Sequence, residues 1–289
     1  MFVSLPPQYW VQRENQGTLA ILREYLEPLQ ALGYSIEQDG ERVTSSLQGR
    51  GNLQEFHLPG RVLVIRRFLR GGLARHFSRD RFLDPDRPFE EIRLGEALRA
   101  AGIATPRAVA ARCQRLGILG FRLELVTERV EGARSVGAVM RQGMADGPAH
   151  DWPALVRAAA CFIRRMHDAG LLHSDLQPEN LLWVPVQGQG PDESQFSILD
   201  LDRSRFTPNQ ALAPEDQAQN LWRLWRYVLK RESPGREALF GPRTYLRFLR
   251  AYELDRGRRR ALNLRLQDLR RSRSRWHSKT PRNPAGSAR

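Results

Sequence analysis

The chain has 289 residues, of which 41% are hydrophobic and 27% are charged, which is ordinary for a soluble globular protein with one large or two small lobes. No run approaches the ~18 apolar residues of a membrane span, the first residues lack the features of a signal peptide, and the two cysteines do not have the spacing of a metal cluster or a disulfide framework. The net charge of +14, carried almost entirely by arginine, favours an anionic partner such as nucleic acid, a membrane surface or a phosphorylated substrate.

The N-terminal part of the chain predicts a helix followed by two strands. Residues 18–32 place leucines on one helical face, and Gly33 follows as the expected helix end. The two strands flank Gly49 and Gly51. Glycines spaced in this way let backbone amides approach a phosphate, although most such pairs are simple hairpin turns. Because the pair precedes the predicted nucleotide-binding strand, we expect Gly49 and Gly51 to cover phosphates.

The next predicted strand, residues 61–66, ends in a cation, Arg66. In protein kinases the matching strand supplies a lysine that contacts the α- and β-phosphates of ATP. Arginine keeps the charge and has two-pronged donors, but it is bulkier and not equivalent to lysine. The residue could be a working arginine variant, the role could have shifted to Arg67, or the enzyme could be impaired. We favour the first interpretation.

A helix over 88–101 carries three glutamates, Glu90, Glu91 and Glu96. In kinases a glutamate from such a helix pairs with the cation of the preceding strand. Each of the three could also lie on a solvated helix face. We select Glu91 as the partner of Arg66, because it begins the sequence Glu-Ile-Arg-Leu.

Two further segments complete the N-terminal half. Residues 67–82 interleave cations with aromatic residues and glycines, which predicts either a solvated basic face or a site for an anionic acceptor or a membrane surface. A strand over 121–130 ends where the hinge of a two-lobed kinase would fall. Adenine would then bond to backbone groups near Glu128 and Val130.

The strongest motif lies after a predicted helix over 152–169. Asp175 and Asn180 have the spacing of the signature H-R-D-L-x-x-x-N, and Asp200 ends the next apolar strand. Phosphoryl transfer needs a carboxylate that accepts the proton of the attacking hydroxyl, and an amide and a second carboxylate that hold the metal. Asp and Asn at this spacing can occur by chance in polar loops, but the flanking apolar segments and Asp200 favour a kinase-type site. We assign His173 to structural hydrogen bonding rather than to general base catalysis.

The C-terminal part predicts helices over 215–230 and 243–254, followed by an arginine-rich segment from Arg256 onward. Leucines within this segment could form a short amphipathic basic helix, which would suit an anionic membrane surface. The alternative is a disordered, soluble tail.

Taken together, these motifs resemble those of the lipopolysaccharide kinase family, and most closely those of the members that act on 3-deoxy-D-manno-octulosonic acid (Kdo). The resemblance runs from about Gly49 to Leu254. It rests on Gly49-Arg50-Gly51, Val64-Ile65-Arg66-Arg67-Phe68-Leu69-Arg70-Gly71-Gly72-Leu73, Glu91 with Ala101-Gly102-Ile103-Ala104-Thr105-Pro106, Leu125-Val126-Thr127-Glu128-Arg129-Val130-Glu131-Gly132, His173-Ser174-Asp175-Leu176, Leu199-Asp200-Leu201-Asp202-Arg203 and Asn220-Leu221-Trp222-Arg223-Leu224.

The resemblance implies an α+β, two-lobed protein-kinase-like fold, with a β-rich N-lobe at about 40–130 and a helical C-lobe at about 133–255. We expect an N-terminal extension with a helix at 1–39 and a basic, partly disordered tail at 256–289. ATP would lie in the cleft between the lobes. The implied roles are phosphate binding by Gly49, Gly51 and Arg66, orientation of Arg66 by Glu91, adenine binding near Glu128 and Val130, Mg²⁺ binding by Asn180 and Asp200, and proton acceptance by Asp175.

The implied reaction is ATP- and Mg²⁺-dependent phosphorylation of a Kdo hydroxyl in the lipid A–Kdo inner core. The enzyme would be cytoplasmic and peripheral on the inner membrane, where the anionic glycolipid agrees with the positive charge. A heptose kinase of the same family, a small protein kinase and a non-catalytic binding module remain alternatives. Nucleic-acid binding has no motif support beyond charge.

Overall fold

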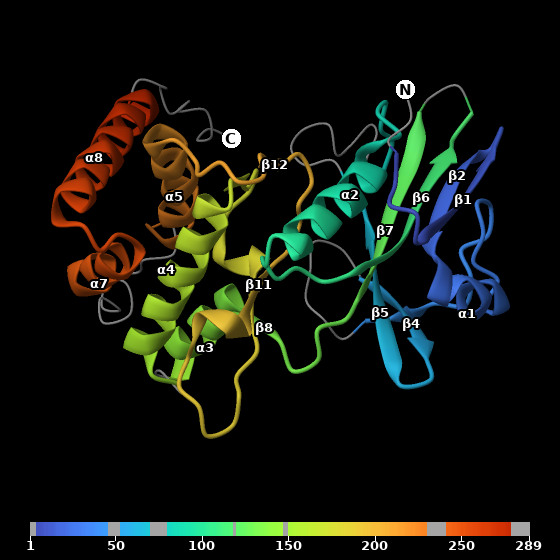
Figure 1. Ribbon diagram of the computed structural model, residues 1–289, viewed down its shortest axis with the longest axis horizontal. Coiled ribbons are helices and arrows are strands. Elements are labelled where there is room, and N and C mark those ends of the chain that lie inside the picture. Colours follow the sequence, from blue (N-terminus) through green and yellow to red (C-terminus); the bar gives the residue numbers. More distant parts are fainter. Residues whose placement is uncertain are drawn as a thin grey trace, which may run out of the picture. The chain divides into compact units, whose positions relative to one another are not determined.

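The computed structural model describes residues 4–45, 53–69, 80–117, 120–146, 150–229 and 241–278, with the side chains of the last helix described to residue 272. These residues form two compact units (Figure 1). One unit comprises the described parts of 1–133 together with 197–206, and the other comprises those of 134–196 and 207–289. The first is built on a β-sheet and the second is largely helical.

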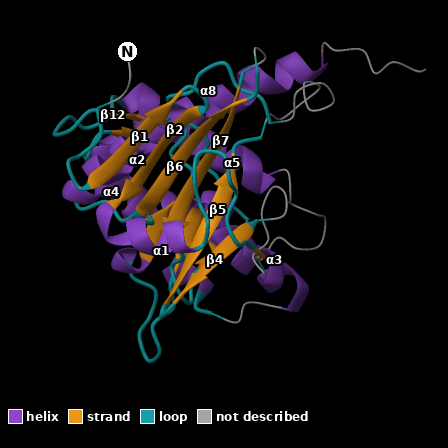
Figure 2. Cartoon of the chain, turned by 90° about the vertical axis from the view of Figure 1, so that its right-hand side faces the viewer, coloured by secondary structure: helices purple, strands orange, loops and turns teal. Residues whose placement is uncertain are grey.

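The first unit contains a seven-stranded sheet in the order β1-β2-β6-β7-β5-β4-β3. All of its neighbouring strands pair antiparallel, and Figure 2 shows β1, β2, β6, β7, β5 and β4 side by side. Their bounds are β1 (Tyr9–Glu14), β2 (Gly17–Leu22), β3 (Val43–Thr44), β4 (Gln54–Leu58), β5 (Arg61–Arg67), β6 (Ala108–Arg115) and β7 (Phe121–Glu128). The strands predicted over 61–66 and 121–130 are therefore present.

The helix predicted over residues 18–32 is wrong in its first part. Residues 17–22 form β2, which pairs with both β1 and β6, and only then do the 3-10 helix η1 (Arg23–Tyr25) and α1 (Leu26–Ala31) follow. Residues 19–22 are buried without alternation, and a strand covered on both faces lacks the period-two pattern that distinguishes it from a helix. Gly17 permits the close approach of β2 to β6, because an added Cβ would lie 2.0 Å from the carbonyl oxygen of Cys113.

The helix predicted over residues 88–101 is present as α2 (Arg87–Ala100), which packs against β6 and β7 of the sheet. Phe89, Ile92 and Leu98 of this helix are fully buried, and Phe89 and Ile92 share a core with buried side chains of the strands. This core contains Phe56, Leu63, Phe89, Ile92, Val109 and Leu123. Burial of this apolar surface fixes α2 and β5 within the same unit.

A cluster of charged side chains lies on three neighbouring strands of the same sheet. Arg67 and Arg112 are the cross-strand partners of Glu124, on β5 and β6 respectively. The Arg112 and Glu124 side chains are each 1% exposed, and they form an ion pair at 2.5 Å. The segment before β3 joins the cluster through Asp39 and Arg42, and Arg42 Nη1 lies 2.8 Å from Glu124. These contacts tie the N-terminal segment to the sheet, and they hold the pKa of Glu124 below its usual range despite the opposing effect of burial.

The second unit contains the helices α3 (Val136–Asp146), α4 (Trp152–Asp168), α5 (Pro214–Leu229), α7 (Pro242–Tyr252) and α8 (Arg256–Ser278). The helices predicted over 152–169, 215–230 and 243–254 are thereby confirmed. The second unit also contains short elements: β8 (Arg134–Ser135), β9 (Leu171–Leu172), the 3-10 helix η3 (Pro178–Asn180), β10 (Leu181–Trp183) and the 3-10 helix η4 (Glu193–Gln195). The strand β11 (Phe196–Ile198) begins in the second unit and ends in the first, and β12 (Arg205–Phe206) belongs to the first unit.

Helix α4 is the central helix of the second unit. Asp151 caps its N-terminus by accepting a hydrogen bond of 2.9 Å from the Ala154 amide, and its apolar face is buried. Helix α7 packs against α4, and α8 packs against α5 (Figure 1). Within the described residues no helix combines the length and the apolar character needed to cross a membrane.

The buried side chain of His167, on α4, is expected to make the stability of the protein depend on pH. The ring is fully buried, lies 2.8 Å from the Tyr252 hydroxyl and 3.0 Å from Asn220 Oδ1, and has a pKa lowered to about 4, chiefly by burial. Below pH 6.5 the unfolded chain binds a proton at this position and the folded chain does not. The free energy of unfolding should therefore fall between pH 6.5 and pH 4, by up to about 3 kcal/mol from this residue alone.

Urea unfolding of the wild type and of His167→Gln at pH 7 and pH 4.5 would measure this contribution. We expect the drop in unfolding free energy to be smaller in the variant, because glutamine does not titrate. Equal drops in the two proteins would show that His167 does not contribute.

Candidate active site

The predicted site residues are divided between the two units. Arg66, Glu91, Glu128, Val130 and Asp200 belong to the first unit, and Asp175 and Asn180 belong to the second. Gly49 and Gly51 lie outside the described residues, as does most of the basic segment predicted over 67–82.

In the first unit, Arg66 contacts two carboxylates. It lies near the end of β5, and its guanidinium forms ion pairs with Glu91 of α2 and, at 2.5 Å, with Asp200 Oδ1. The guanidinium carbon is also 4.5 Å from the ring centroid of Phe68. The predicted pairing of Arg66 with Glu91 is therefore present. The next residue, Arg67, forms ion pairs with Asp39 and Glu124 instead, so the two arginines have no acidic partner in common in these contacts.

Glu91 links Arg66 to the backbone that follows Asp200. One carboxylate oxygen pairs with Arg66, and the other accepts a hydrogen bond of 3.1 Å from the Leu201 amide. Burial raises the pKa of Glu91 to about 7; Arg66 opposes this shift, and the neighbouring Asp200 and Asp202 add to it. A single buried carboxylate thus fixes both the cation and the turn that presents Asp200.

The turn from Asp200 to Arg203 has a specific backbone conformation. Asp200 has a φ of 59° and Arg203 a φ of 56°, both in the left-handed region that residues other than glycine seldom adopt. Asp202 is held by an ion pair with Arg87 at the start of α2, with Arg87 Nε 3.0 Å from Asp202 Oδ1. The turn is therefore anchored by side chains of β5 and α2, and the Asp200 carboxylate is about one-third exposed.

In the second unit, Asp175 lies in a loop fixed by hydrogen bonds. Its amide donates to His173 Nδ1 at 3.2 Å, and its Oδ2 accepts from Gln177 Nε2 at 2.8 Å. His173 is fully buried, and its carbonyl accepts from Asn220 at 2.6 Å and from Arg223 at 3.2 Å. Because Nδ1 of His173 accepts a hydrogen bond from the Asp175 amide, this ring nitrogen is unprotonated. The contact agrees with a structural role for the ring.

Asn180 follows on η3 and is nearly buried. Its amide nitrogen donates a hydrogen bond of 2.8 Å to the carbonyl of Asp175. This hydrogen bond identifies which side-chain atom of Asn180 is the nitrogen. The other atom, the amide oxygen, is the one suited to bind a metal. An amide oxygen and a carboxylate such as that of Asp200 are the hard oxygen donors that Mg²⁺ prefers, usually together with water and substrate phosphates. Among the described residues no three His, Cys, Asp or Glu side chains form a metal-binding group.

The predicted adenine-binding segment lies at the end of β7. The Glu128 amide donates to the carbonyl of Arg107 at 2.9 Å, and the Glu128 carboxylate accepts from the Tyr25 hydroxyl at 2.6 Å. A base at this position would therefore use other backbone groups of the segment, of which Val130, half-buried, is one.

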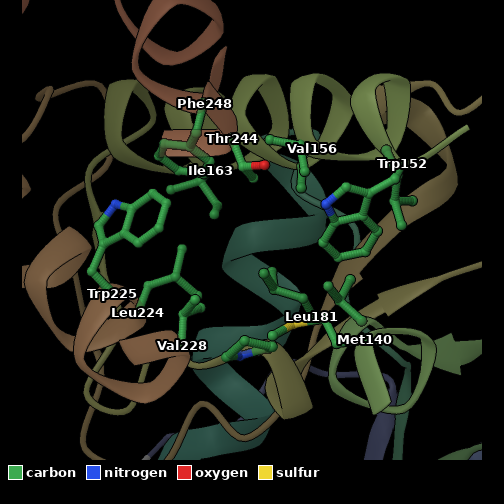
Figure 3. Close-up of a pocket in the computed structure, with 14 residues that line it drawn as sticks. Met140, Trp152, Val156, Ile163, Leu181, Leu224, Trp225, Val228, Thr244 and Phe248 are labelled. Atoms are coloured by element: carbon green, nitrogen blue, oxygen red, sulfur yellow. The ribbon is translucent and has the colours of Figure 1, made fainter. Parts of the chain in front are cut away.

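An apolar pocket of the second unit is not part of this chemistry. Figure 3 shows it between the side chains of α3, α4, α5 and α7, with Met140, Trp152, Ile163 and Val228 among its lining residues. None of the fourteen lining residues is charged. The pocket therefore offers no charged side chain to a phosphate or a metal ion.

Several residues of the site were missed by sequence reasoning. Neither the ion pair of Arg87 with Asp202 nor the hydrogen bonds of Gln177 and Asn220 in the Asp175 loop were predicted. Gln177 lies within the motif, two residues after Asp175, and could have been found there. Arg87 and Asp202 are 115 residues apart, and no sequence signal connects them.

Comparisons with known proteins agree on one family. The model of the lipopolysaccharide kinase (Kdo/WaaP) family matches residues 35–252. A 3-deoxy-D-manno-octulosonic acid kinase of Xanthomonas axonopodis pv. citri (strain 306) is 35% identical over 254 residues, which cover 85% of this chain and 94% of the relative. A protein of the same description from Actinobacillus succinogenes is 33% identical over 197 residues, 65% of this chain and 76% of the relative.

One solved structure supports the fold. A structure of WaaP in complex with acyl carrier protein covers 88% of this chain and 95% of its own, with a TM-score of 0.57 and 23% sequence identity. At this identity the likeness shows the fold alone, and it confirms the predicted α+β, protein-kinase-like architecture.

Proposed function

The chain belongs to the lipopolysaccharide kinase (Kdo/WaaP) family, and we therefore propose that it transfers a phosphoryl group from ATP to a hydroxyl of Kdo in the lipid A–Kdo inner core. The observation that carries this proposal is the similarity to a Kdo kinase over 94% of that protein's length. The presence of Asp175, Asn180 and Asp200 at the positions of the kinase motifs supports catalysis over a purely binding role.

In the proposed reaction Asp175 is the general base. The acceptor oxygen attacks the γ-phosphorus, its proton passes to the Asp175 carboxylate, and the bond from phosphorus to the bridging oxygen breaks to release ADP. Gln177 orients the carboxylate through the hydrogen bond to Oδ2. The buried carbonyl contacts of His173 hold the loop, so that little reorganisation is needed at the moment of transfer.

Asn180 and Asp200 would hold Mg²⁺, which when bound neutralises charge on the phosphates. Arg66 would brace the phosphates, with Glu91 as its orienting partner; the contacts of Arg66 with Glu91 and Asp200 favour a working arginine over a role shifted to Arg67. Gly49 and Gly51 would cover the phosphates, and backbone groups near Glu128 and Val130 would bind adenine.

The acceptor can be tested directly with the purified chain, γ-labelled ATP and Mg²⁺. Kdo-bearing lipid A precursor, heptose-bearing core glycolipid and a protein mixture would be offered separately. We expect label on the Kdo glycolipid. Label confined to the heptose-bearing glycolipid would favour a heptose kinase, label on protein would favour a protein kinase, and label on none of them would favour a binding module.

We also propose that the enzyme works as a peripheral protein on the cytoplasmic face of the inner membrane. From α7 to residue 271 the chain carries ten arginines and three acidic residues. Two exposed leucines, Leu246 on α7 and Leu264 on α8, have arginines within one helical turn. Exposed apolar side chains among cations suit an anionic lipid surface.

Charge removal on this surface should weaken vesicle binding. Each arginine near an anionic bilayer contributes about 1 kcal/mol, so the triple variant Arg243→Gln, Arg250→Gln, Arg260→Gln should bind anionic vesicles about 100-fold less tightly. A control that replaces Arg23, Arg93 and Arg99, exposed residues of the first unit, with glutamine has the same net charge. Equal binding of the two variants in a sedimentation assay would refute the assignment of the surface.

A further inference from the structure

We propose that Glu179 is a positioning residue that holds Asn180 in place for magnesium, and that Gly137 lacks a side chain because the Glu179 carboxylate occupies that space. This inference deepens the proposed function and rests on it. It concerns η3, the single turn that carries both Glu179 and Asn180.

The Glu179 carboxylate receives hydrogen bonds from three separate elements. Ser135, at the end of β8, donates its hydroxyl to Oε2 at 2.9 Å, and Tyr227 of α5 donates to Oε1 at 2.7 Å. Arg141 of α3 forms an ion pair with Oε1. The carboxylate is therefore the common acceptor of donors from β8, α3 and α5.

Ser135 connects this carboxylate to the start of α3. Its oxygen accepts a hydrogen bond of 3.0 Å from the Ala138 amide, as the cap of the helix. The hydroxyl proton is then directed to Glu179. The N-terminus of α3 and the Asp175 loop are thus joined through one side chain.

Gly137, in the first turn of α3, makes this arrangement possible. A Cβ added at Gly137 would lie 2.4 to 2.5 Å from the carbon and both oxygens of the Glu179 carboxylate. A side chain at this position would force the carboxylate away from its three donors, and a glycine within the first turns of a helix otherwise disfavours helix formation. The absent side chain is therefore explained by the carboxylate and not by the backbone of the helix.

Glu179 can affect catalysis because it is adjacent to Asn180 in the sequence. Glu179 precedes Asn180, whose amide nitrogen is bound to the Asp175 carbonyl and whose oxygen is the proposed metal ligand. α5 also fixes the other end of the same loop, because Asn220 donates to the His173 carbonyl. With Glu179 held by α3 and α5, the loop is fixed at both ends, and neither Asn180 nor Asp175 needs to be ordered when the metal binds.

The test compares the magnesium dependence of phosphoryl transfer in Gly137→Ala, Glu179→Gln and the wild type. We expect the Mg²⁺ concentration for half-maximal rate to rise about tenfold in both variants, and rate to recover in part at high Mg²⁺, because a displaced ligand weakens metal binding by 10- to 100-fold. Gly143→Ala, the same substitution in the same helix, should keep the wild-type magnesium dependence.

Two further variants separate positioning from stability. Tyr227→Phe removes one donor to Glu179 while conserving most of the side-chain volume, and it should shift the magnesium dependence in the same direction by a smaller factor. In a Glu179→Ala background, Gly137→Ala should have no additional effect, since the clash is with the carboxylate. Thermal unfolding of each variant reports any change in folding separately.

The outcomes distinguish this inference from the proposed function. A wild type that transfers no phosphate to any acceptor would overturn the proposed function. An active wild type with variants of unchanged magnesium dependence, or additive effects of Gly137→Ala and Glu179→Ala, would overturn the inference alone.

Discussion

Replacing Asp175 with alanine is expected to lower the rate of phosphoryl transfer about 100- to 10,000-fold, the range that general base catalysis contributes. The carboxylate is the proposed acceptor of the hydroxyl proton, and alanine provides no group to replace it. Nucleotide affinity should change little, because the proposed nucleotide contacts of Arg66 and Asp200 belong to the other unit of the chain. Single-turnover transfer and a separate measurement of ATP binding would report the two quantities.

The loop around Asp175 should survive the substitution. The contacts that hold it come from the backbone of residues 173 and 175 and from Asn180 and Asn220, all of which remain in the variant. Asp268→Ala, which changes an exposed aspartate on α8, provides the matched control and should retain full activity. Turnover by Asp175→Ala within threefold of the wild type would rule out the assigned role.

The second large effect is expected from Arg66→Ala. The substitution leaves Glu91, whose side chain is 6% exposed, buried beside Asp200 without its cation. Breaking a buried ion pair costs about 3–5 kcal/mol, and because Arg66 is itself 27% exposed we expect about 3 kcal/mol of unfolding free energy to be lost. Nucleotide affinity and transfer rate should fall as well, because the cation proposed to bind the phosphates is lost and the turn of Asp200 loses an anchor.

Two companion variants test the reason for this loss. Arg66→Lys keeps the charge but lacks the planar fork that reaches both carboxylates, so its stability and activity should be intermediate. Glu91→Gln added to Arg66→Ala removes the unpaired buried carboxylate and should recover part of the lost stability. If urea unfolding showed Arg66→Ala to be as stable as the wild type, the ion pair would not hold α2 to β5.

The pH dependence of Arg66→Ala has a definite sign. Arg66 lowers the pKa of Glu91, so its removal raises that pKa further above the 4.5 of an unfolded chain. The folded variant then binds a proton that the unfolded chain releases, and its unfolding free energy falls as pH rises through neutrality. The wild type should show a weaker fall over the same range.

The kinase motifs could be read from the sequence because each is local. The spacing of Asp175 and Asn180 and the apolar strand before Asp200 identify a family without any knowledge of long-range contacts. The choice of Glu91 among three glutamates was also correct in its contact with Arg66, although any of the three could have lain on a solvated face. The catalytic roles themselves remain predictions.

Long-range electrostatic contacts could not be predicted. The donors to Glu179 are 38 to 48 residues away in the sequence, and the cluster around Glu124 combines residues from four different segments. Such pairs depend on which strands become neighbours, and arginine is so frequent in this chain that no particular partner is indicated by composition. The strand at 17–22 was missed for the related reason that its burial depends on both neighbouring strands.

The most direct test of the proposed function is the position of the phosphate on the product. Lipid A bearing Kdo would be incubated with the wild-type protein, ATP and Mg²⁺, the Kdo would be released by mild acid, and both fragments would be analysed by mass spectrometry. We expect the Kdo fragment to gain one phosphoryl group, the lipid A fragment to remain unchanged, and Asp175→Ala to yield neither. A phosphoryl group on the lipid A fragment, or an unmodified glycolipid alongside phosphorylated protein, would contradict the proposal.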